Sequence, residues 1–332
     1  MQQAPITASV VIVTYNRPDH VQTCLEHLSH QTLSPQEIIV VDASPELRTA
    51  EVVDQFPGIT YLRNDLGMGH MATSRSIGIA RATGDVVAFI DDDAYAEPGW
   101  LAALVERYRD ARVGAVGGSA RNGQPGEESE GVDQIGRLLP DGRLTGYFAA
   151  DPGHDVEVDH LLGANMSFRR EVVEEIGGIH DHYPGTCLRE DADTALRVRR
   201  SGYRVVFTPD AVVLHVGGTY AKGRRFDARY QYFGARNHVV LLTHTLGFSD
   251  PRTRRYLRSV GPTILRELGS AGTAFRDPDR RTLTSKVRGT AGALVRAGAF
   301  GVGTVTGLVA AVRLAWEPTH RRRAEATPPP ST

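Results

Sequence analysis

The sequence predicts an α/β fold in which helices flank a mostly parallel, doubly wound sheet. Short uninterrupted apolar runs recur along the first third of the chain, and segments with apolar residues at helical spacing separate them. Such runs are typical of strands buried on both faces of a parallel sheet. Two of them end in carboxylates, at Asp42 and Asp91, and open α/β sheets bind their ligands at the carboxyl ends of strands.

The predicted strands and helices alternate in chain order. Strands are expected at residues 9–14, 37–42, 59–62, 86–90 and 113–118. Helices are expected between them, at residues 18–28, 45–55, 71–82 and 98–108. Pro18 suits the first turn of a helix, where a missing N–H removes no hydrogen bond. This alternation predicts parallel strands joined by right-handed crossovers.

The regular alternation stops near residue 121. Glycine, proline and acidic residues dominate residues 121–159, and a connection of this length is usually a functional loop or a local insertion. The elements expected after it are a strand at 161–168, helices at 170–176 and from 189 onward, and a pair of strands at 203–207 and 211–216.

Length and composition set outer limits on the function. A chain of 332 residues allows one large domain or two ordinary ones. The formal net charge of −1 argues against nucleic acid as a partner, and the two cysteines match no metal-ligand spacing. The first residues lack the pattern of a signal peptide, and no apolar run reaches the roughly 20 residues of a clear transmembrane helix. We therefore expect a cytoplasmic protein.

Three adjacent carboxylates, Asp91, Asp92 and Asp93, follow directly on the apolar run 86–90. They repel one another unless water, a cation or hydrogen-bond donors lie between them. A hard divalent cation suits such a cluster of oxygen ligands, and Mg²⁺ also binds substrate phosphates. On the triplet alone, an acidic turn without a metal remains an equal alternative.

The turn after the first predicted strand excludes two common nucleotide-binding motifs. A dinucleotide-binding domain and a P-loop both need glycines there, and the turn Tyr15–Pro18 has none. A nucleotide bound by this sheet therefore needs other contacts.

Several short motifs, taken together and in order, make the chain similar to the inverting glycosyltransferases of family 2, which have the GT-A fold. The resemblance covers roughly residues 8–240. Its motifs are Val13-Thr14-Tyr15-Asn16, Asp42, Arg75 with Gly78, the acid triplet, Gly163-Ala164-Asn165, Glu190-Asp191, Gly202-Tyr203-Arg204-Val205 and His215. Each is weak alone, and the order makes the set specific.

The resemblance implies a nucleotide-sugar donor, namely a UDP- or dTDP-linked hexose or deoxyhexose. Thr14, Tyr15 and Asn16 would line the nucleotide pocket. Asp42 would accept a hydrogen bond from the imide N–H of the base. Arg75 would lie near the diphosphate, where a guanidinium can bind phosphate oxygens in a bidentate manner.

The resemblance also implies a metal site for Mn²⁺ or Mg²⁺. Asp91 and Asp92 would hold the ribose and position the water shell of the metal. Asp93 would ligate the metal directly, and His215 would complete the site. For each of these residues a purely structural role, such as a turn, a cap or a strand end, stays open.

The general base is assigned by the same resemblance to Asp191, beside Glu190. An acceptor hydroxyl has a pKa far above neutrality and needs such a base. The acceptor class stays open between a glycan, a lipid-linked molecule and a small molecule. Two alternative functions also stay open: a sugar nucleotidyltransferase, and a non-catalytic protein that binds a membrane surface through its basic C-terminal region. Glycosidase chemistry also uses two carboxylates, and only the nucleotide-type sheet argues against it.

We expect a catalytic domain at residues 1–220, with a nucleotide-binding half at about 8–118 and an acceptor half at about 119–220. A helical region at 221–316 and a disordered tail at 317–332 would follow. Apolar residues between Leu294 and Trp316 have helical spacing. We favour a helix packed on the catalytic domain there, and peripheral contact with a membrane surface is the alternative.

Overall fold

The computed structural model describes residues 5–217, 228–276 and 282–316. The chain divides into two compact units, Met1–Phe226 and Asp227–Thr332. The tail expected at 317–332 and the domain boundary expected at residue 220 lie outside the described residues.

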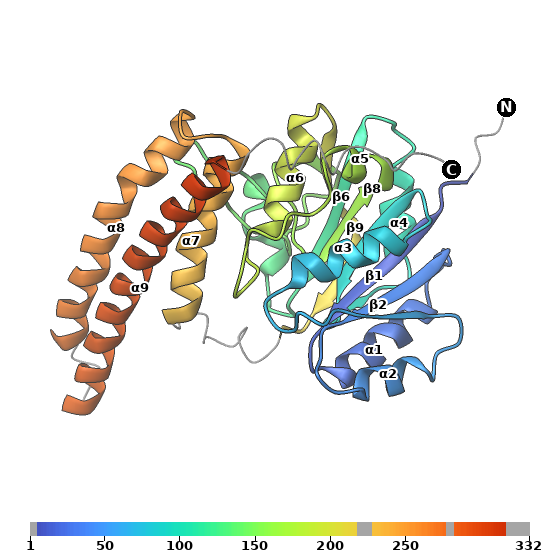
Figure 1. Ribbon diagram of the computed structural model, residues 1–332, viewed down its shortest axis with the longest axis horizontal. Coiled ribbons are helices and arrows are strands. Elements are labelled where there is room, and N and C mark those ends of the chain that lie inside the picture. Colours follow the sequence, from blue (N-terminus) through green and yellow to red (C-terminus); the bar gives the residue numbers. More distant parts are fainter. Residues whose placement is uncertain (1–4, 218–227, 277–281, 317–332) are drawn as a thin grey trace. The chain divides into compact units, whose positions relative to one another are not determined.

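The first unit is built on one sheet, which has nine strands within the described residues (Figure 1). The strands are β1 (Ala8–Thr14), β2 (Glu37–Asp42), β3 (Thr60–Arg63), β4 (Val86–Asp91), β5 (Ala94–Ala96), β6 (Val113–Arg121), β7 (Val156–Glu157), β8 (Asn165–Arg169) and β9 (Arg204–His215). Their order is β3-β2-β1-β4-β8-β6-β9-β5, and β7 pairs with β9 beside this path.

Helices cover both faces of this sheet. They are α1 (Pro18–Ser29), α2 (Arg48–Val53), α3 (Met71–Arg81), α4 (Trp100–Arg107), α5 (Arg170–Glu175) and α6 (Glu190–Arg200), with short 3₁₀ turns at Glu127–Ser129 and Val132–Gln134. Alternate residues of β1 enter two different cores: Val10 and Ile12 join α1 and α4, whereas Val11 and Val13 join α3, α5 and α6. A strand buried on both faces explains the uninterrupted apolar run.

The predicted α/β class is confirmed, and the sheet is mixed. Strands β3, β2, β1 and β4 are parallel, as the alternation predicted. Strand β8 lies antiparallel between β4 and β6, and β5 lies antiparallel to β9.

The expected pair of strands at 203–207 and 211–216 is wrong, because both segments belong to the single strand β9. Its pairing with β6 is parallel, and the register shifts between Thr208 and Val213. Pro209 lies within this irregularity, where its missing N–H removes no ladder hydrogen bond. The strand can therefore continue to His215.

The buried side chain of Asn165 ties three strands of the sheet together. Its Nδ2 donates to the carbonyl oxygens of Ser119 and Ala211, each at 2.9 Å. Its Oδ1 accepts from Nε1 of Trp100 at 2.8 Å. This residue of the Gly163–Asn165 motif thus has a structural task.

Replacing Gly118 by alanine should destabilise this junction. An added Cβ would overlap the carbonyl oxygen of Ala211 and crowd Nδ2 of Asn165. We expect the free energy of unfolding in urea to fall by about 1–3 kcal/mol, the usual effect of overpacking. Gly146→Ala is the control, since nothing lies within 4 Å of its added Cβ. Equal stability of the two variants would contradict this packing.

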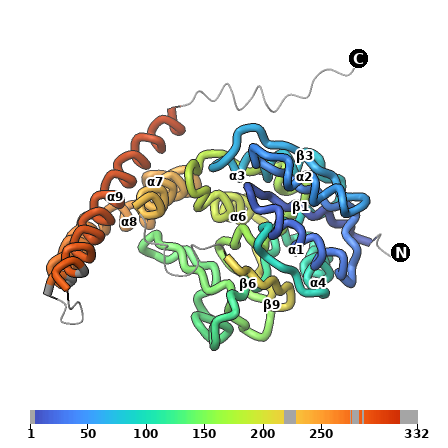
Figure 2. The backbone as a smooth tube through the Cα atoms, turned by 90° about the horizontal axis from the view of Figure 1, so that it is seen from below, coloured from blue at the N-terminus to red at the C-terminus, as the bar shows by residue number. Residues whose placement is uncertain are grey.

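The second unit contains α7 (Ala228–Thr245), α8 (Pro251–Arg276) and α9 (Leu283–Trp316). Helix α9 packs against α7 and α8 (Figure 2). Gly303 and Gly307 permit a close approach, because an added Cβ would meet the backbone of Tyr232 or Arg236 on α7.

Candidate functional site

The ends of β1 and β4 bring the first candidate residues together. The two strands are parallel neighbours, with Val13 opposite Asp91. Oγ1 of Thr14 donates to Oδ2 of Asp92 at 2.7 Å. The turn that follows β1 places Tyr15 half-buried and Asn16 exposed at the same edge.

Arg17 lies between two acids of the triplet, and the sequence analysis assigned it no role. Its Nη2 is 2.7 Å from Oδ1 of Asp92, and its Nη1 is 2.7 Å from Oδ2 of Asp93. Burial raises the pKa of Asp92 to about 7, against the opposing charge of Arg17. The sequence offered one signal that could have identified Arg17, namely its position directly after the motif Thr14-Tyr15-Asn16. The positive charge of Arg17 offsets the repulsion among the acids, as a bound metal cation would.

A second cluster joins Asp91, Asp93 and His215, whose ligand atoms all lie within 4.8 Å of one another. Pairing of β5 with the end of β9 produces it, because Ala94 stands opposite His215 and the N–H of Val216 donates to the carbonyl of Asp93. Nε2 of His215 is 3.4 Å from Oδ1 of Asp93.

The donor set of this cluster fits a divalent cation. Burial disfavours ionisation of Asp93, but the hydrogen bond with His215 and the charge of Arg17 outweigh it and lower the pKa of Asp93 to about 2. An ionised carboxylate, a second carboxylate and an imidazole nitrogen are ligands that a divalent ion such as Mn²⁺ accepts. A cation there would share Asp93 with Arg17.

Arg75 connects the acid triplet to helix α6. Its guanidinium is almost fully buried and forms ion pairs with Asp91, at 3.0 Å, and with Glu190. The same guanidinium donates to the carbonyl oxygen of Gly163 at 3.0 Å. Two carboxylates already engage this side chain, so its expected contact with a diphosphate stays a prediction.

Asp191 lies in the first turn of α6, on the other side of this connection. Its Oδ2 accepts from the N–H of Gly163 at 3.0 Å, and its Oδ1 accepts from the N–H of Ala192 at 2.7 Å. The residue is only partly buried. Gly163 thus binds Arg75 through its carbonyl and Asp191 through its N–H. These contacts connect the acid triplet to the pair Glu190 and Asp191.

Asp42 lies at the end of β2 and is fully buried. Its Oδ1 accepts hydrogen bonds from the N–H and the hydroxyl of Ser44, and its Oδ2 accepts from the hydroxyl of Tyr61 at 2.8 Å. A nearby cavity is lined by Thr14, Tyr15, Arg17, Gly69, His70 and Thr186, among others. Asp42 is not part of its lining, so the expected contact with a nucleotide base stays a prediction.

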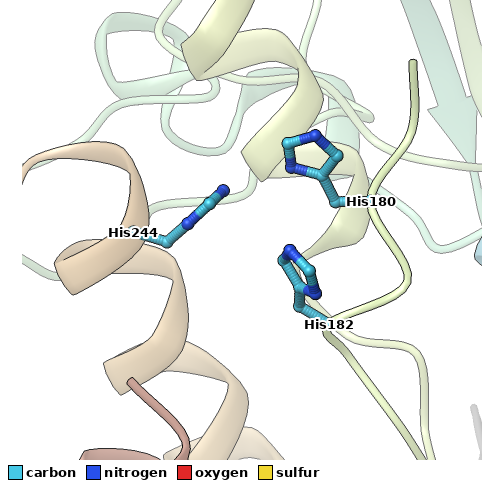
Figure 3. A group of neighbouring side chains, drawn as sticks. All are labelled: His180, His182 and His244. Carbon is cyan, nitrogen blue, oxygen red and sulfur yellow. The ribbon is translucent and has the colours of Figure 1, made fainter. Parts of the chain in front are cut away.

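Two further histidines of the first unit, His180 and His182, lie close together (Figure 3), with ring centroids 5.1 Å apart. His244, drawn in the same figure, belongs to α7 of the second unit. The pair supplies two nitrogen ligands, whereas a structural zinc site usually needs four protein ligands. We assign no metal to it.

A buried histidine next to the site predicts a pH-dependent stability. Nε2 of His160 lies 2.9 Å from the carbonyl oxygen of Thr145. Burial lowers the pKa of His160, with the charge of Asp191 opposing. Its pKa in the folded state is then below the value of about 6.5 in the unfolded chain, so the unfolded chain binds more protons. The free energy of unfolding is therefore highest above about pH 6.5 and decreases as the pH falls below that value.

Urea unfolding at several pH values between 8 and 5 tests this expectation. The variant His160→Gln keeps a donor for Thr145 and removes the titrating group. We expect the stability of the wild type to fall more steeply with acidification than that of the variant. Parallel curves would show that His160 does not contribute.

Comparison with known proteins places the chain in a family. The family model described as glycosyl transferase family 2 matches residues 9–177, just over half of the chain. The chain belongs to glycosyl transferase family 2. A second model, glycosyl transferase family group 2, matches residues 148–316.

Two relatives carry names that specify the sugar they transfer. The glucosyl-dolichyl phosphate glucuronosyltransferase of Haloferax volcanii is 32% identical over 219 residues, which cover 62% of this chain and 68% of that protein. The O-antigen chain rhamnosyltransferase RfbN of Salmonella typhimurium is 25% identical over 214 residues, covering 62% and 65% respectively. This family 2 chain is therefore a glycosyltransferase, as predicted.

A solved structure identifies the fold. The mannosyltransferase PcManGT from Pyrobaculum calidifontis, in complex with GDP-Man and Mn²⁺, superposes with a TM-score of 0.57 at 18% identity, over 95% of this chain and 88% of that one. GalNAc-T7 with UDP, GalNAc and Mn²⁺ reaches a TM-score of 0.50 at 17% identity, covering 76% of this chain and 54% of that one. The predicted GT-A fold is confirmed.

Proposed function

We propose that this enzyme transfers a hexose or deoxyhexose from a UDP- or dTDP-sugar to an acceptor hydroxyl, with inversion at the anomeric carbon. One observation carries the proposal: Arg75 and Gly163 connect the acid cluster at the end of β4 to Asp191 on α6. These contacts would hold the proposed donor site and the proposed base in a fixed arrangement. A nucleotidyltransferase would need a glycine-rich basic loop after β1, and the turn Tyr15–Pro18 lacks it.

The donor nucleotide would occupy the cavity beside Thr14 and Tyr15. Asn16 lies in the same turn, and its backbone N–H donates to Oγ of Ser44, which also contacts Asp42. A uracil or thymine imide N–H would reach the fully buried Asp42 only after the hydroxyl of Tyr61 moves aside, and would then take one of the roughly four lone-pair sites of the carboxylate. Asp92, held by Thr14, would accept from the ribose hydroxyls.

A divalent cation would be held by Asp91, Asp93 and His215, and the two solved structures described above are complexes with Mn²⁺. Bound there, the cation would stabilise the negative charge that develops on the leaving nucleoside diphosphate. The residues of this chain do the rest: Arg17 orients Asp92 and Asp93, and Arg75 orients Asp91.

Asp191 would act as the general base. The acceptor oxygen forms a bond to the anomeric carbon as the bond from that carbon to the diphosphate oxygen breaks, and the hydroxyl proton moves to Asp191. The N–H groups of Gly163 and Ala192 fix the orientation of the carboxylate. Glu190, paired with Arg75, would hold the first turn of α6 in place. A single displacement inverts the configuration at the anomeric carbon.

The acceptor we propose is a glycan or a lipid-linked molecule. The two relatives support this class, since one is named for a dolichyl phosphate substrate and the other for an O-antigen chain. A small-molecule acceptor is the remaining alternative. The reaction would take place in the cytoplasm, where nucleotide sugars are available.

A thermal-shift screen tests the donor. A ligand that binds only the folded state raises the melting temperature. We expect UDP or dTDP, with Mn²⁺ present, to raise it more than GDP does, and EDTA to reduce the shift. A larger shift with GDP would contradict the nucleotide assignment, and no shift with any nucleoside diphosphate would contradict the donor site.

A further inference from the structure

Within the second unit, helix α9 presents one continuous apolar face that the described residues of α7 and α8 leave uncovered. We call this face the outer stripe. It consists of Val287, Leu294, Val302, Val305, Val309, Val312 and Trp316, whose exposed fractions run from 47% to 84%. Steps of three, four, seven and eight residues separate its members, which keeps them on one side of an α-helix. Ala291 and Gly298, also exposed, fill the two longer gaps.

The opposite face of α9 consists of small residues and is buried. Ala293, Ala297 and Ala311 are nearly inaccessible, and Gly303 and Gly307 approach the backbone of α7. A helix of 34 residues is about 51 Å long at 1.5 Å per residue. The sequence analysis favoured packing of these residues on the catalytic domain, which stays a prediction; within the second unit, the contacts of α9 use the small residues instead.

Length and composition alone would allow the segment Lys286–Trp316 to cross a membrane, and only 28% of its most apolar window is buried. Helix α8, which packs along α9, carries charges that disfavour such a crossing. Arg254, Arg258 and Arg266 on α8 are exposed, and a charged side chain in the hydrocarbon core of a bilayer is costly. A helix with one free apolar face and charged neighbours lies in the interface plane.

The charge of the second unit indicates what covers the outer stripe. In its described part the arginines and lysines far outnumber the two acids, Asp250 and Glu267. Both acids are already paired, with Arg252 and Arg296. Arg288 and Arg313 are exposed, and each lies one residue beyond a member of the stripe. Their charges would face lipid phosphates while their stems lie along the acyl boundary.

We propose that the outer stripe of α9 docks this enzyme on an anionic lipid surface, with the arginines of α8 and α9 at the head groups. A second copy of the chain is a weaker candidate, because pairing two such units would bring like charges together. The inference goes beyond the proposed function, and it can fail while the sugar-transfer proposal stands, since lipid binding needs no nucleotide sugar.

The chain carries its own fluorescent reporter. It has two tryptophans: Trp100 is fully buried, and Trp316 in the outer stripe is 84% exposed. Vesicles of phosphatidylcholine with phosphatidylglycerol, about 7:3, should shift the emission of Trp316 to shorter wavelength and carry the full-length protein down on sedimentation. Pure phosphatidylcholine should bind less. Trp316→Phe should lose the shift and keep most of the binding.

A matched pair of variants tests the stripe itself. Val305→Glu with Val309→Glu should weaken vesicle binding by about tenfold or more, whereas Val305→Leu with Val309→Leu should keep it. Circular dichroism and the melting temperature show whether each variant is folded. Unchanged binding by a folded glutamate variant overturns the proposal, as does failure of the wild type to bind either vesicle.

Two other outcomes would replace the proposal. If the wild type stays in the membrane after a high-pH carbonate wash, α9 spans the bilayer. If light scattering shows a dimer that the glutamate variant converts to a monomer, and vesicle binding is unaffected, the stripe is an interface between two copies.

Discussion

Replacing Asp191 by asparagine is expected to reduce the turnover number by about 10²- to 10⁴-fold, the usual contribution of a general base. Asparagine has nearly the same shape, but its amide oxygen cannot take the proton of the acceptor hydroxyl. The N–H groups of Gly163 and Ala192 face the carboxylate, so a small loss of order in the first turn of α6 can accompany the change. Affinity for the nucleoside diphosphate should change little, because the proposed donor contacts lie on the other side of Arg75.

Asp193 provides the control for this prediction. It lies two residues further along α6, is fully buried, and accepts from Arg197 at 2.7 Å and from the hydroxyl of Tyr183 at 2.9 Å. Asp193→Asn should therefore lower stability, whereas Asp191→Asn should lower turnover at nearly unchanged stability. Near-normal turnover by Asp191→Asn would remove Asp191 from the chemistry.

Chelation by EDTA is expected to abolish sugar transfer, and added Mn²⁺ or Mg²⁺ should restore it. The cluster of Asp91, Asp93 and His215 offers two carboxylates and one imidazole, and loss of the ionised Asp93 would remove one of the two carboxylates. Asp93→Ala should therefore be inactive, and excess metal should not restore its activity. The same change also leaves Arg17 with only Asp92 as a partner.

Asp54 is a suitable control for the metal experiment, because it is an exposed carboxylate at the end of α2. Asp54→Ala should keep both full activity and its response to EDTA. Turnover that persists in EDTA, or an Asp93→Ala variant that is as active as Asp54→Ala, would exclude the metal from the mechanism.

The parts of the fold that were predictable are those set by local patterns. Apolar runs predicted β1, β2 and β4, because a strand that is buried on both faces is an uninterrupted apolar run in the sequence. The antiparallel entry of β8 and the unbroken course of β9 through Pro209 depend on contacts with β6 that lie far away in the sequence. No local pattern encodes such a register.

The site shows the same division. The triplet, Asp191 and His215 were found through motifs, whereas the interactions that connect them were not. Arg17 binds the neighbouring Asp92 and Asp93, and Arg75 binds Asp91 and Glu190 from different parts of the chain. Which carboxylates each arginine meets depends on how strands and helices pack. The outer stripe of α9 was visible as helical spacing, but spacing alone does not say which face is covered.

Calorimetric titration of UDP and of dTDP into the protein, with and without Mn²⁺, tests the central claim most directly. If the acids at the end of β4 hold a cation that binds a diphosphate, at least one of these ligands should bind about tenfold or more tightly when Mn²⁺ is present, and Asp93→Ala should abolish that gain. Equal affinity with and without the metal, or no heat from either ligand, would contradict the account.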